Sequence, residues 1–191
     1  MHFELPLILA SASPRRKQLL TESGFVFETL PPDESAEDAR LPDEVPVEYV
    51  KRLALQKAEN VAKKVERGII LGCDTIVLCG ETILEKPTDR NDARRMIQYL
   101  RGQVHHVLSG LCLLQKTGEV TTIRQESAIT RLKMQSISDE DVETYLNTGQ
   151  WQGKAGAFGY QDGNDWITLL EGSESNVVGL PMELFLEMFL A

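Results

Sequence analysis

Residues 7–17 read Leu7-Ile8-Leu9-Ala10-Ser11-Ala12-Ser13-Pro14-Arg15-Arg16-Lys17, and they predict a buried strand that runs directly into a helix. The apolar run at 7–10 is typical of a buried strand. Ser13 suits the N-cap of the helix, and Pro14 suits the first helical position, where its missing N–H would have no partner in any case. Strand-to-helix units of this kind are typical of α/β proteins.

The three cations that open this helix depart from the acidic character of the chain, whose formal net charge is −9. A helix N-terminus presents free N–H groups and the positive end of the helix dipole, which together favour an anion. Arg15, Arg16 and Lys17 add positive charge at the same place. We interpret the stretch as a phosphate site; the alternative is a solvated basic face on a short helix.

Length and composition narrow the class of protein. The chain has 191 residues, 42% of them hydrophobic and 26% charged, as expected for a soluble globular protein with a real core. Its net negative charge argues against general nucleic-acid binding. The apolar runs are too short to span a membrane, and no basic segment precedes Leu5, so we expect neither a membrane anchor nor a signal peptide.

The three cysteines, Cys73, Cys79 and Cys112, form no Cys-x-x-Cys pair. We expect them to be reduced core residues of a cytoplasmic protein. His105 and His106 are adjacent, so in a strand they point to opposite faces, which is poor spacing for metal ligands.

Strand and helix signals alternate irregularly and include hairpins, which predicts an α/β fold with a mixed rather than a purely parallel sheet. Strands are expected at 7–10, 25–30, 69–78, 82–84, 104–114 and 120–132. Helices are expected from Ser13 to Gly24, over 46–67, from Thr88 or Asp89 to Gly102, from Ser138 through Leu146, and over 181–190. Two further segments, 158–161 and 166–170, flank a turn at Asp162-Gly163-Asn164.

Asp74 is the best candidate for a catalytic carboxylate because it interrupts the apolar run from Ile69 to Leu78. An unpaired buried carboxylate is costly, so Asp74 must face water, a cation or a hydrogen-bond donor. The alternative is a carboxylate that caps neighbouring backbone. With an ordinary pKa near ~3.9, an aspartate is a weak base at pH 7, and a raised pKa or a divalent metal would be needed to activate water.

Three lysines stand at informative places. Lys57 lies in the inward-facing stretch Leu53–Ala58, and Lys86 precedes Pro87 in a loop. Lys154 lies among small residues at 153–159, where backbone could approach a ligand closely. The overlapping stretch from Gly149 to Ala155 is no P-loop, because its glycine spacing is one residue short and Ala155 replaces the Ser or Thr that would hold Mg²⁺.

Four segments together resemble one family. They are Leu9-Ala10-Ser11-Ala12-Ser13-Pro14-Arg15-Arg16, Gly72-Cys73-Asp74-Thr75, Glu85-Lys86-Pro87 and Lys154-Ala155-Gly156-Ala157-Phe158-Gly159-Tyr160-Gln161. In order and spacing they are similar to the Maf family of nucleoside triphosphate pyrophosphatases over nearly the whole chain. The resemblance implies a single domain over 1–191, with an elongated mixed sheet, flanking helices and a cleft between two lobes.

The resemblance also implies an activity. The expected enzyme is cytoplasmic, acts on acid anhydrides, and cleaves a nucleoside triphosphate between the α and β phosphates to give the monophosphate and pyrophosphate. It is expected to use Mg²⁺ or Mn²⁺, to take a small nucleotide as its substrate, and to form a homodimer. Two alternatives remain: a nucleotide-binding regulator linked to cell division and septum formation without turnover, and a phosphatase that removes the terminal phosphate.

The family's functional positions map onto this chain residue by residue. Asp74 matches the catalytic base, and Glu34 in the acidic loop matches a carboxylate that could bind the metal together with Asp74. Arg15, Thr75 and Gln161 match the positions that separate substrate subtypes, and their identities fit the dTTP/UTP type rather than the 7-methyl-GTP type. Further pocket residues match Ser11, Arg16, Lys57 and Lys86.

The amide of Gln161 suits a pyrimidine base, because its C=O can accept N3–H and its NH₂ can donate to O4. A flipped amide would suit cytosine equally well. The chain departs from the family pattern at Asp162, where many relatives have Gly. It also departs in the segment 172–181, which keeps Gly179-Leu180-Pro181 but changes the residues before them.

Overall fold

A computed structural model describes residues 5–163 and 165–190 of the chain. Within it the chain divides into two compact units, which are described one by one below. Unit 1 comprises residues 5–74, 109–128 and 179–190, and unit 2 comprises 75–108, 129–163 and 165–178. Asn164, the last residue of the expected turn, lies outside the described residues, as do Met1–Glu4 and Ala191.

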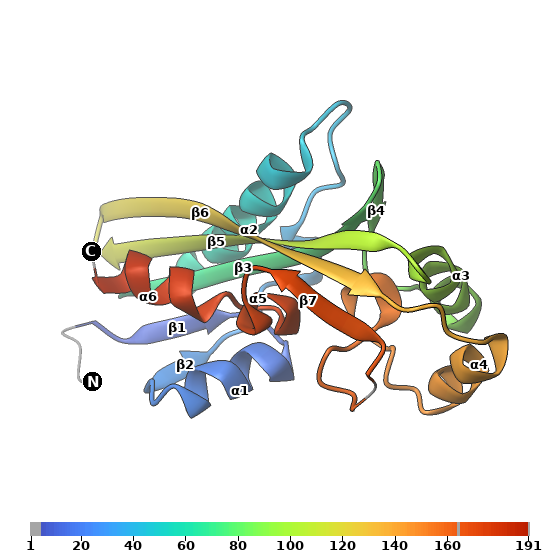
Figure 1. Cartoon of the computed structure of the whole chain (residues 1–191). Coiled ribbons are helices and arrows are strands. Elements are labelled where there is room, and N and C mark those ends of the chain that lie inside the picture. Colours follow the sequence, from blue (N-terminus) through green and yellow to red (C-terminus); the bar gives the residue numbers. More distant parts are fainter. Residues whose placement is uncertain (1–4, 164, 191) are drawn as a thin grey trace. The chain divides into compact units, whose positions relative to one another are not determined.

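The observed elements alternate between strands and helices, as the sequence predicts (Figure 1). In chain order they are β1 (Leu7–Ala10), α1 (Pro14–Glu22), β2 (Phe27–Thr29), η1 (Glu34–Ala36), α2 (Pro46–Ala62), β3 (Arg67–Cys79), β4 (Thr82–Leu84), α3 (Arg90–Leu100), β5 (Val104–Thr117), β6 (Val120–Met134), α4 (Asp139–Asn147), η2 (Ala155–Ala157), β7 (Ile167–Glu171), α5 (Glu174–Val178) and α6 (Met182–Leu190).

The strands form a seven-stranded mixed sheet, which confirms the predicted fold class. Its order is β2-β1-β3-β5-β6-β7, with β4 paired to β3. β1 runs parallel to β2 and to β3, whereas β4 is antiparallel to β3 and β7 is antiparallel to β6. β3, β5 and β6 contribute residues to both units.

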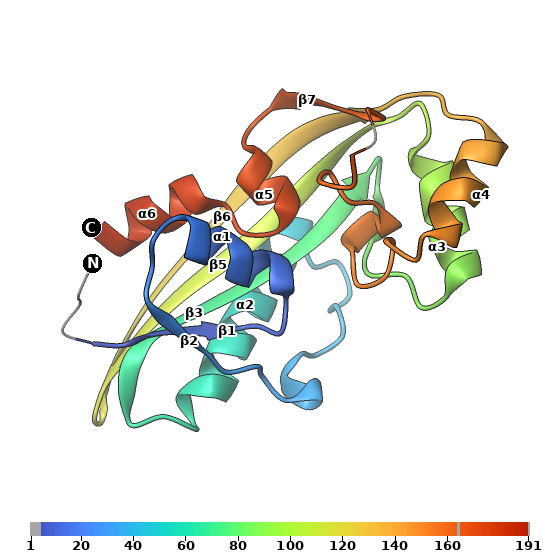
Figure 2. The same cartoon turned by 90° about the horizontal axis from the view of Figure 1, so that it is seen from below.

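Unit 1 has a core on each face of its part of the sheet, because successive strand residues point to opposite faces. One core holds Leu7 and Leu9 of β1 together with residues of α1 and α6, such as Leu20 and Phe185. The other holds Ile8 and Ala10 of β1 together with apolar residues of α2. Figure 2 shows α1 and α6 on the near face of these strands and α2 behind them. Both faces of β1 are therefore buried, and Ser11, the residue that follows the strand, is buried as well.

Unit 2 has its own core, built from the C-terminal half of β3, the N-terminal half of β5 and the helices α3 and α4. Asp89 caps α3 by accepting a hydrogen bond from the Asp92 N–H. Ser138 and Asp141 form the predicted capping box at the start of α4. Tyr145 of α4 contacts the rings of Phe158 and Trp166, so the segment that contains Gln161 packs against this helix.

The predicted end of the helix α2 is wrong. The apolar spacing of 46–67 predicts a helix as far as Arg67, but α2 ends at Ala62 and Arg67 already belongs to β3. Lys116 of β5 explains the early end, because its ammonium donates to the carbonyl oxygens of Ala62 and Val65 at 2.8 and 3.0 Å. A cation at these carbonyls satisfies the end of the helix and favours its termination there.

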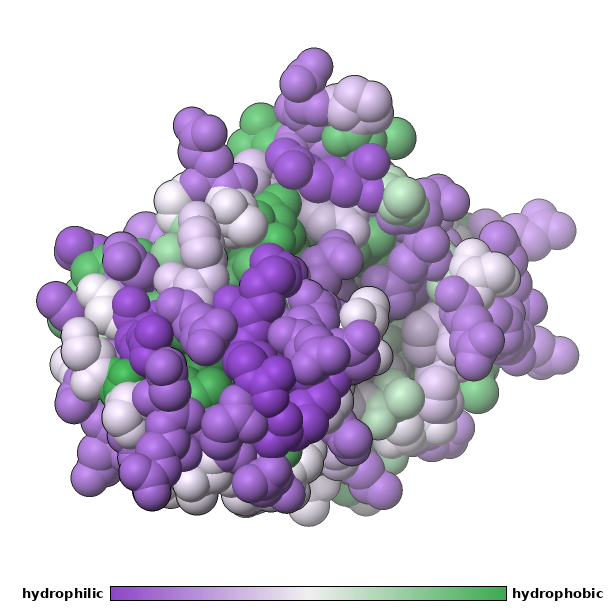
Figure 3. All heavy atoms as spheres, turned by 90° about the vertical axis from the view of Figure 1, so that its right-hand side faces the viewer, coloured by the Kyte–Doolittle hydropathy of each residue, from purple (hydrophilic) through white to green (hydrophobic). Residues whose placement is uncertain are grey.

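Hydrophilic residues cover most of the face shown in Figure 3, and apolar residues occur there only in small groups. This agrees with the burial of most large apolar side chains in the hydrophobic cores. Among the helices of residues 5–163 and 165–190, none is both long and apolar enough to cross a membrane.

Candidate functional site

The start of α1 forms as its sequence predicts. Ser13 has extended backbone angles, and its hydroxyl accepts a hydrogen bond from the Arg16 N–H at 3.5 Å. Pro14 occupies the first helical turn. The hydroxyl of Ser11 accepts a second hydrogen bond, from the Ser13 N–H at 3.2 Å. The turn between β1 and α1 is therefore held by two serine side chains, and the helix N-terminus lies directly beside the buried strand.

Arg16 is buried, unlike Lys17, which is exposed. Its guanidinium donates through Nε to the Gly179 carbonyl at 2.8 Å and through Nη1 to the Ser11 hydroxyl at 3.1 Å. Arg15 is half-buried on the same turn. The basic cluster is therefore not a uniformly solvated face. The structure brings Ser11 and Arg16 together, as the family resemblance implies, and Arg16 also fixes α1 to the segment before α6.

Two glycines let α2 lie unusually close to the sheet of unit 1. A Cβ on Gly72 of β3 would overlap the Ala54 carbonyl oxygen and come within 3.1 Å of Ala58 Cβ. A Cβ on Gly110 of β5 would overlap the Val50 carbonyl in the same way. Helix α2 therefore presses its backbone against β3 just before Asp74, and this close approach brings the next turn of the helix to that carboxylate.

Lys57 occupies a core position of α2 and ends at Asp74. Helical spacing from Leu53 and Ala54 turns it inward, and it is only 4% exposed. Its ammonium lies 2.5 Å from Oδ1 of Asp74, which is 8% exposed. The requirement that a buried Asp74 must face a cation or a donor is thus met by Lys57. This geometry does not favour the alternative in which Asp74 caps neighbouring backbone.

A second carboxylate contacts the same ammonium. Oε2 of Glu37 lies 3.0 Å from Lys57 Nζ, although the Glu37 side chain is 39% exposed. Glu37 therefore lies on the solvent side of the Lys57–Asp74 pair. Sequence reasoning did not single it out, because the loop between β2 and α2 is rich in acidic residues that look alike.

The acidic loop follows one stripe of α2. Arg52, Gln56 and Asn60 recur every fourth residue and so share one face of the helix, and Lys64 continues this spacing in the turn after α2. Arg52 binds both carboxylate oxygens of Glu44 at 2.7 and 2.8 Å, Gln56 donates to Asp38 at 2.6 Å, and Asn60 and Lys64 bind Asp33 at 3.0 and 2.8 Å. These contacts fasten the loop along the helix and hold Glu37 beside Lys57.

The ion pairs of this loop stabilise its charged carboxylates. The hydrogen bond from Lys64 lowers the pKa of Asp33, and Asn60 adds to the effect. The hydrogen bonds from Arg52 lower the pKa of Glu44 in the same way. Both carboxylates therefore stay charged well below neutral pH, and the loop keeps its attachment to α2 over that range.

Two carboxylates near Lys57 could contribute oxygen ligands to a divalent cation. Asp74 and Glu37 approach one ammonium, while Glu34, the carboxylate implied by the resemblance, is exposed on η1. In the part of the chain that the structure describes, no three His, Cys, Asp or Glu side chains gather to hold a metal on their own. Mg²⁺ typically binds one or two carboxylates and completes its shell with water and substrate phosphates, so this donor set suits it.

The other predicted site residues belong to unit 2. Thr75 follows Asp74 in β3 and is half-buried, Lys86 follows β4 and is exposed, and Gln161 is exposed in the segment after η2. The Gly156 N–H donates to the Glu85 carbonyl at 3.0 Å, which joins the loop of Lys86 to that of Gln161. Their approach to the residues of unit 1 stays a prediction.

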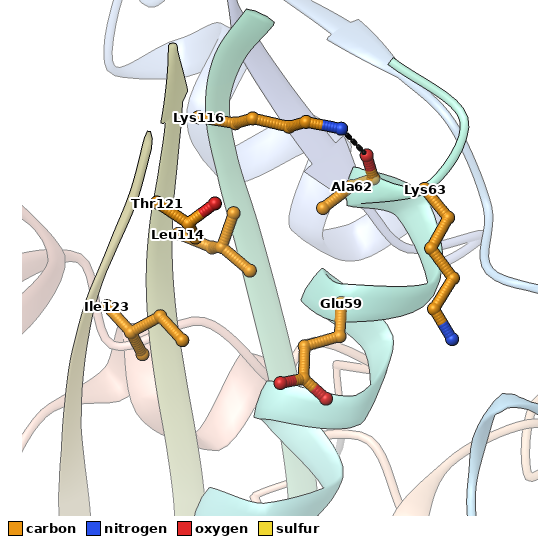
Figure 4. A pocket seen from close by; sticks show the side chains of 7 residues that line it. All are labelled: Glu59, Ala62, Lys63, Leu114, Lys116, Thr121 and Ile123. Carbon is orange, nitrogen blue, oxygen red and sulfur yellow. Dashed lines mark hydrogen bonds between the residues drawn. The ribbon is translucent and has the colours of Figure 1, made fainter. Parts of the chain in front are cut away.

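A separate hollow of about 370 Å³ lies in unit 1 between the C-terminal part of α2 and the strands β5 and β6 (Figure 4). Glu59, Lys63 and Lys116 are among its lining residues, and none of the predicted site residues belongs to it. The Lys116 ammonium turns to the Ala62 carbonyl, as described above. We therefore assign the hollow no role in the site.

Fold and site together define an α/β protein in which a helix N-terminus with buried Arg16 belongs to the same unit as a buried Lys57–Asp74 pair. The family model described as Maf-like protein matches residues 6–191. The chain belongs to this Maf family, which confirms the resemblance seen in the sequence.

Curated relatives cover most of the chain. A protein of Rhodopirellula baltica named dTTP/UTP pyrophosphatase is 44% identical over 183 residues, which are 95% of this chain and 80% of the relative. A protein of Koribacter versatilis with the same name is 42% identical, over 92% of this chain and 89% of the relative. Another of that name, from Ruminiclostridium cellulolyticum, is 39% identical, over 92% of this chain and 90% of the relative.

Proposed function

We propose that this protein is a nucleoside triphosphate pyrophosphatase that acts on dTTP or UTP, or on related nucleotides. It would convert the triphosphate and one water molecule to the monophosphate and pyrophosphate. The observation that carries the proposal is the buried Lys57–Asp74 pair in a chain whose relatives are named dTTP/UTP pyrophosphatase. We also propose that both units belong to one domain over residues 1–191.

Asp74 is the proposed general base. It would accept a proton from the water whose oxygen attacks the α-phosphorus, while the bond to the bridging oxygen of the β-phosphate breaks. Its contact with Lys57 directs one of its two oxygens to the ammonium.

The cations of the chain match the charge of the substrate. A triphosphate carries about four negative charges, and more charge builds on the leaving pyrophosphate in the transition state. Arg15, Arg16, Lys57 and Lys86 are the proposed phosphate-binding residues, with Ser11 as a hydroxyl donor beside Arg16. Arg16 would act with a fixed side chain, because Ser11 and Gly179 already hold it in place.

Asp74 and Glu34 are the proposed ligands of a divalent metal, Mg²⁺ or Mn²⁺, and Glu37 is the further carboxylate that the structure places at Lys57. When bound, such an ion would neutralise phosphate charge. Thr75 and Gln161 are the proposed residues that recognise the base, together with Arg15. We further propose a cytoplasmic homodimer, which cell fractionation and size-exclusion chromatography with light scattering would test.

The decisive experiment is product analysis on dTTP, UTP, CTP and 7-methyl-GTP with Mg²⁺ or Mn²⁺. We expect monophosphate and pyrophosphate from dTTP or UTP. Orthophosphate instead of pyrophosphate would identify a phosphatase. Nucleotide binding without any turnover would identify the regulatory alternative.

The role of Asp74 is tested by the variant Asp74→Asn, which keeps the size of the side chain but removes the base. We expect its turnover to fall by about 10³-fold while its circular dichroism spectrum stays that of the parent protein. Asp139→Asn, at an exposed carboxylate of unit 2, is the control and should keep full activity. Full activity in Asp74→Asn would remove Asp74 from the mechanism.

A further inference from the structure

The segment that contains Gln161 is closed by an ion pair within unit 2. The ammonium of Lys154 contacts both carboxylate oxygens of Asp162, and the two side chains are only 12% and 9% exposed. The residues between them, including Gln161, form a short loop whose ends this pair joins. A pair of charges with so little solvent contact is costly unless further hydrogen bonds complete it.

Tyr145 of α4 supplies those hydrogen bonds. Its hydroxyl donates to Oδ2 of Asp162 at 2.6 Å and accepts from the Gly159 N–H at 3.2 Å. The Asp162 N–H in turn donates to the Gly159 carbonyl at 3.2 Å. The main chain is therefore held immediately before and after the residues Tyr160 and Gln161, while the Gln161 side chain stays exposed.

Aromatic packing also holds the segment that contains Gln161 in place. The rings of Tyr145, Phe158 and Trp166 lie in mutual contact, with centroids 5.1 to 5.8 Å apart. Ala157 has a φ of 61°, an uncommon value for a residue with a side chain, and it persists because the surrounding structure fixes it.

Gly159 has no room for a side chain. A Cβ there would overlap the Lys154 ammonium and the Asp162 carboxylate. The ion pair thus fills the space that a larger residue at 159 would need.

We propose that Lys154, Asp162 and Tyr145 are positioning residues that fix the main chain at Gln161 and so make its amide discriminate between nucleotide bases. This inference rests on the proposed function, in which Gln161 faces the base. An amide held at one place can meet the donors and acceptors of one base edge, whereas a mobile one must be ordered at each binding event. Asp162, a residue at which the chain departs from its family, is thereby given a role in substrate choice.

The test compares Asp162→Asn and Tyr145→Phe with the parent protein and with the control Asp139→Asn. Asp162→Asn removes the charge at constant size, and Tyr145→Phe removes only the hydroxyl while it keeps the ring. Asp139 is the matched control, because its ion pair with Arg101 lies in the same unit but its side chain is 76% exposed. Dissociation constants for dTTP, UTP and CTP are measured by calorimetry without divalent metal, and kcat and KM are measured with it.

We expect Asp162→Asn to weaken binding of the preferred nucleotide about tenfold and to reduce its preference over CTP by a similar factor, with kcat changed less than about threefold. Tyr145→Phe should shift the same ratio in the same direction by about threefold. Asp139→Asn should match the parent protein in every measurement.

Unchanged selectivity in both variants would overturn the inference. So would an equal loss for all nucleotides together with a lower melting temperature, since that result would indicate a purely structural role. Absence of turnover in the parent protein would refute the proposed function alone, because the binding ratios still test the inference. Absence of nucleotide binding would refute both.

Discussion

The ammonium of Lys57 lies 2.5 Å from Oδ1 of Asp74, and both side chains are buried. The two residues come from different elements of unit 1, the helix α2 and the strand β3. Each satisfies the charge of the other, and Glu37 approaches the same ammonium from the solvent side. All three charges belong to unit 1, so the fold of that unit alone specifies their contacts.

Replacement of Lys57 by Met should leave Asp74 as a buried carboxylate without its cation. We expect the free energy of unfolding to fall by about 3 kcal/mol. We also expect kcat/KM for the preferred nucleotide to fall by about 100-fold, because a cation that can face the phosphates is lost. Urea denaturation and steady-state kinetics measure the two effects.

The matched control for this variant is Lys64→Met. Lys64 lies two residues beyond the end of the same helix and also pairs with an aspartate, Asp33, but that pair is more exposed. It should change stability by less than about 1 kcal/mol and leave turnover unchanged. Equal effects of the two substitutions would show that Lys57 has no special role.

The close approach of α2 to the sheet predicts that Gly72→Ala is strongly destabilising. The added methyl group would overlap the Ala54 carbonyl oxygen, and neither backbone can move without disturbing its own hydrogen bonds. We expect a loss of about 3 kcal/mol in the free energy of unfolding, measured by urea denaturation. Thr121→Ala, at an exposed strand position, should change it by less than about 0.5 kcal/mol. A stable Gly72→Ala variant would mean that α2 can shift, and its Lys57–Asp74 contact with it.

Local chemistry explains why much of this fold can be predicted from the sequence. The N-cap at Ser13 and the capping box at Ser138 depend on residues within four positions of each other, so both are visible in the sequence. The end of α2 depends instead on Lys116, 54 residues beyond Ala62, which no local pattern reveals. The apolar residue Val65 continues the helical spacing past the true end and so leads to an overlong helix.

In the candidate site, too, local sequence patterns reveal single residues but not the contacts between distant ones. Periodicity identifies Lys57 as an inward-facing lysine and the interrupted apolar run identifies Asp74, but neither pattern shows that they meet. The spacing of Arg52, Gln56, Asn60 and Lys64 favours an acidic loop that lies along α2, but it does not single out Glu37 among the acidic residues of that loop. The pair of Lys154 and Asp162 has no such signal, because it depends on the path of an irregular loop.

The metal dependence of activity should distinguish Glu34 from Glu37, two carboxylates of the acidic loop. If Glu34 binds the metal, as the resemblance implies, Glu34→Gln should raise the Mn²⁺ concentration for half-maximal activity by about tenfold. Glu37→Gln is the comparison, because Glu37 already contacts Lys57 and its loss should alter that contact more than metal affinity. Activity titrated with Mn²⁺ measures both. A shift confined to Glu37→Gln would assign the metal to Glu37 and would contradict the prediction for Glu34.

Stability should fall in mild acid because of His105 at the start of β5. The pKa of His105 is lowered to about 4, mainly by burial; a hydrogen bond with the Gln103 backbone opposes this shift, and the neighbouring His106 adds to it. Between pH 6.5 and 4 the unfolded chain therefore binds a proton that the folded protein does not. Stability from this residue is fully present above the ordinary histidine pKa and is lost as the pH falls toward 4.

We expect His105 to lower the free energy of unfolding by about 2 kcal/mol between pH 7.5 and pH 5. Urea denaturation at the two pH values measures it: His105→Gln should lose this part of the decrease, whereas His106→Gln should retain most of it. An equal decrease in the parent protein and in His105→Gln would show that acid sensitivity arises elsewhere.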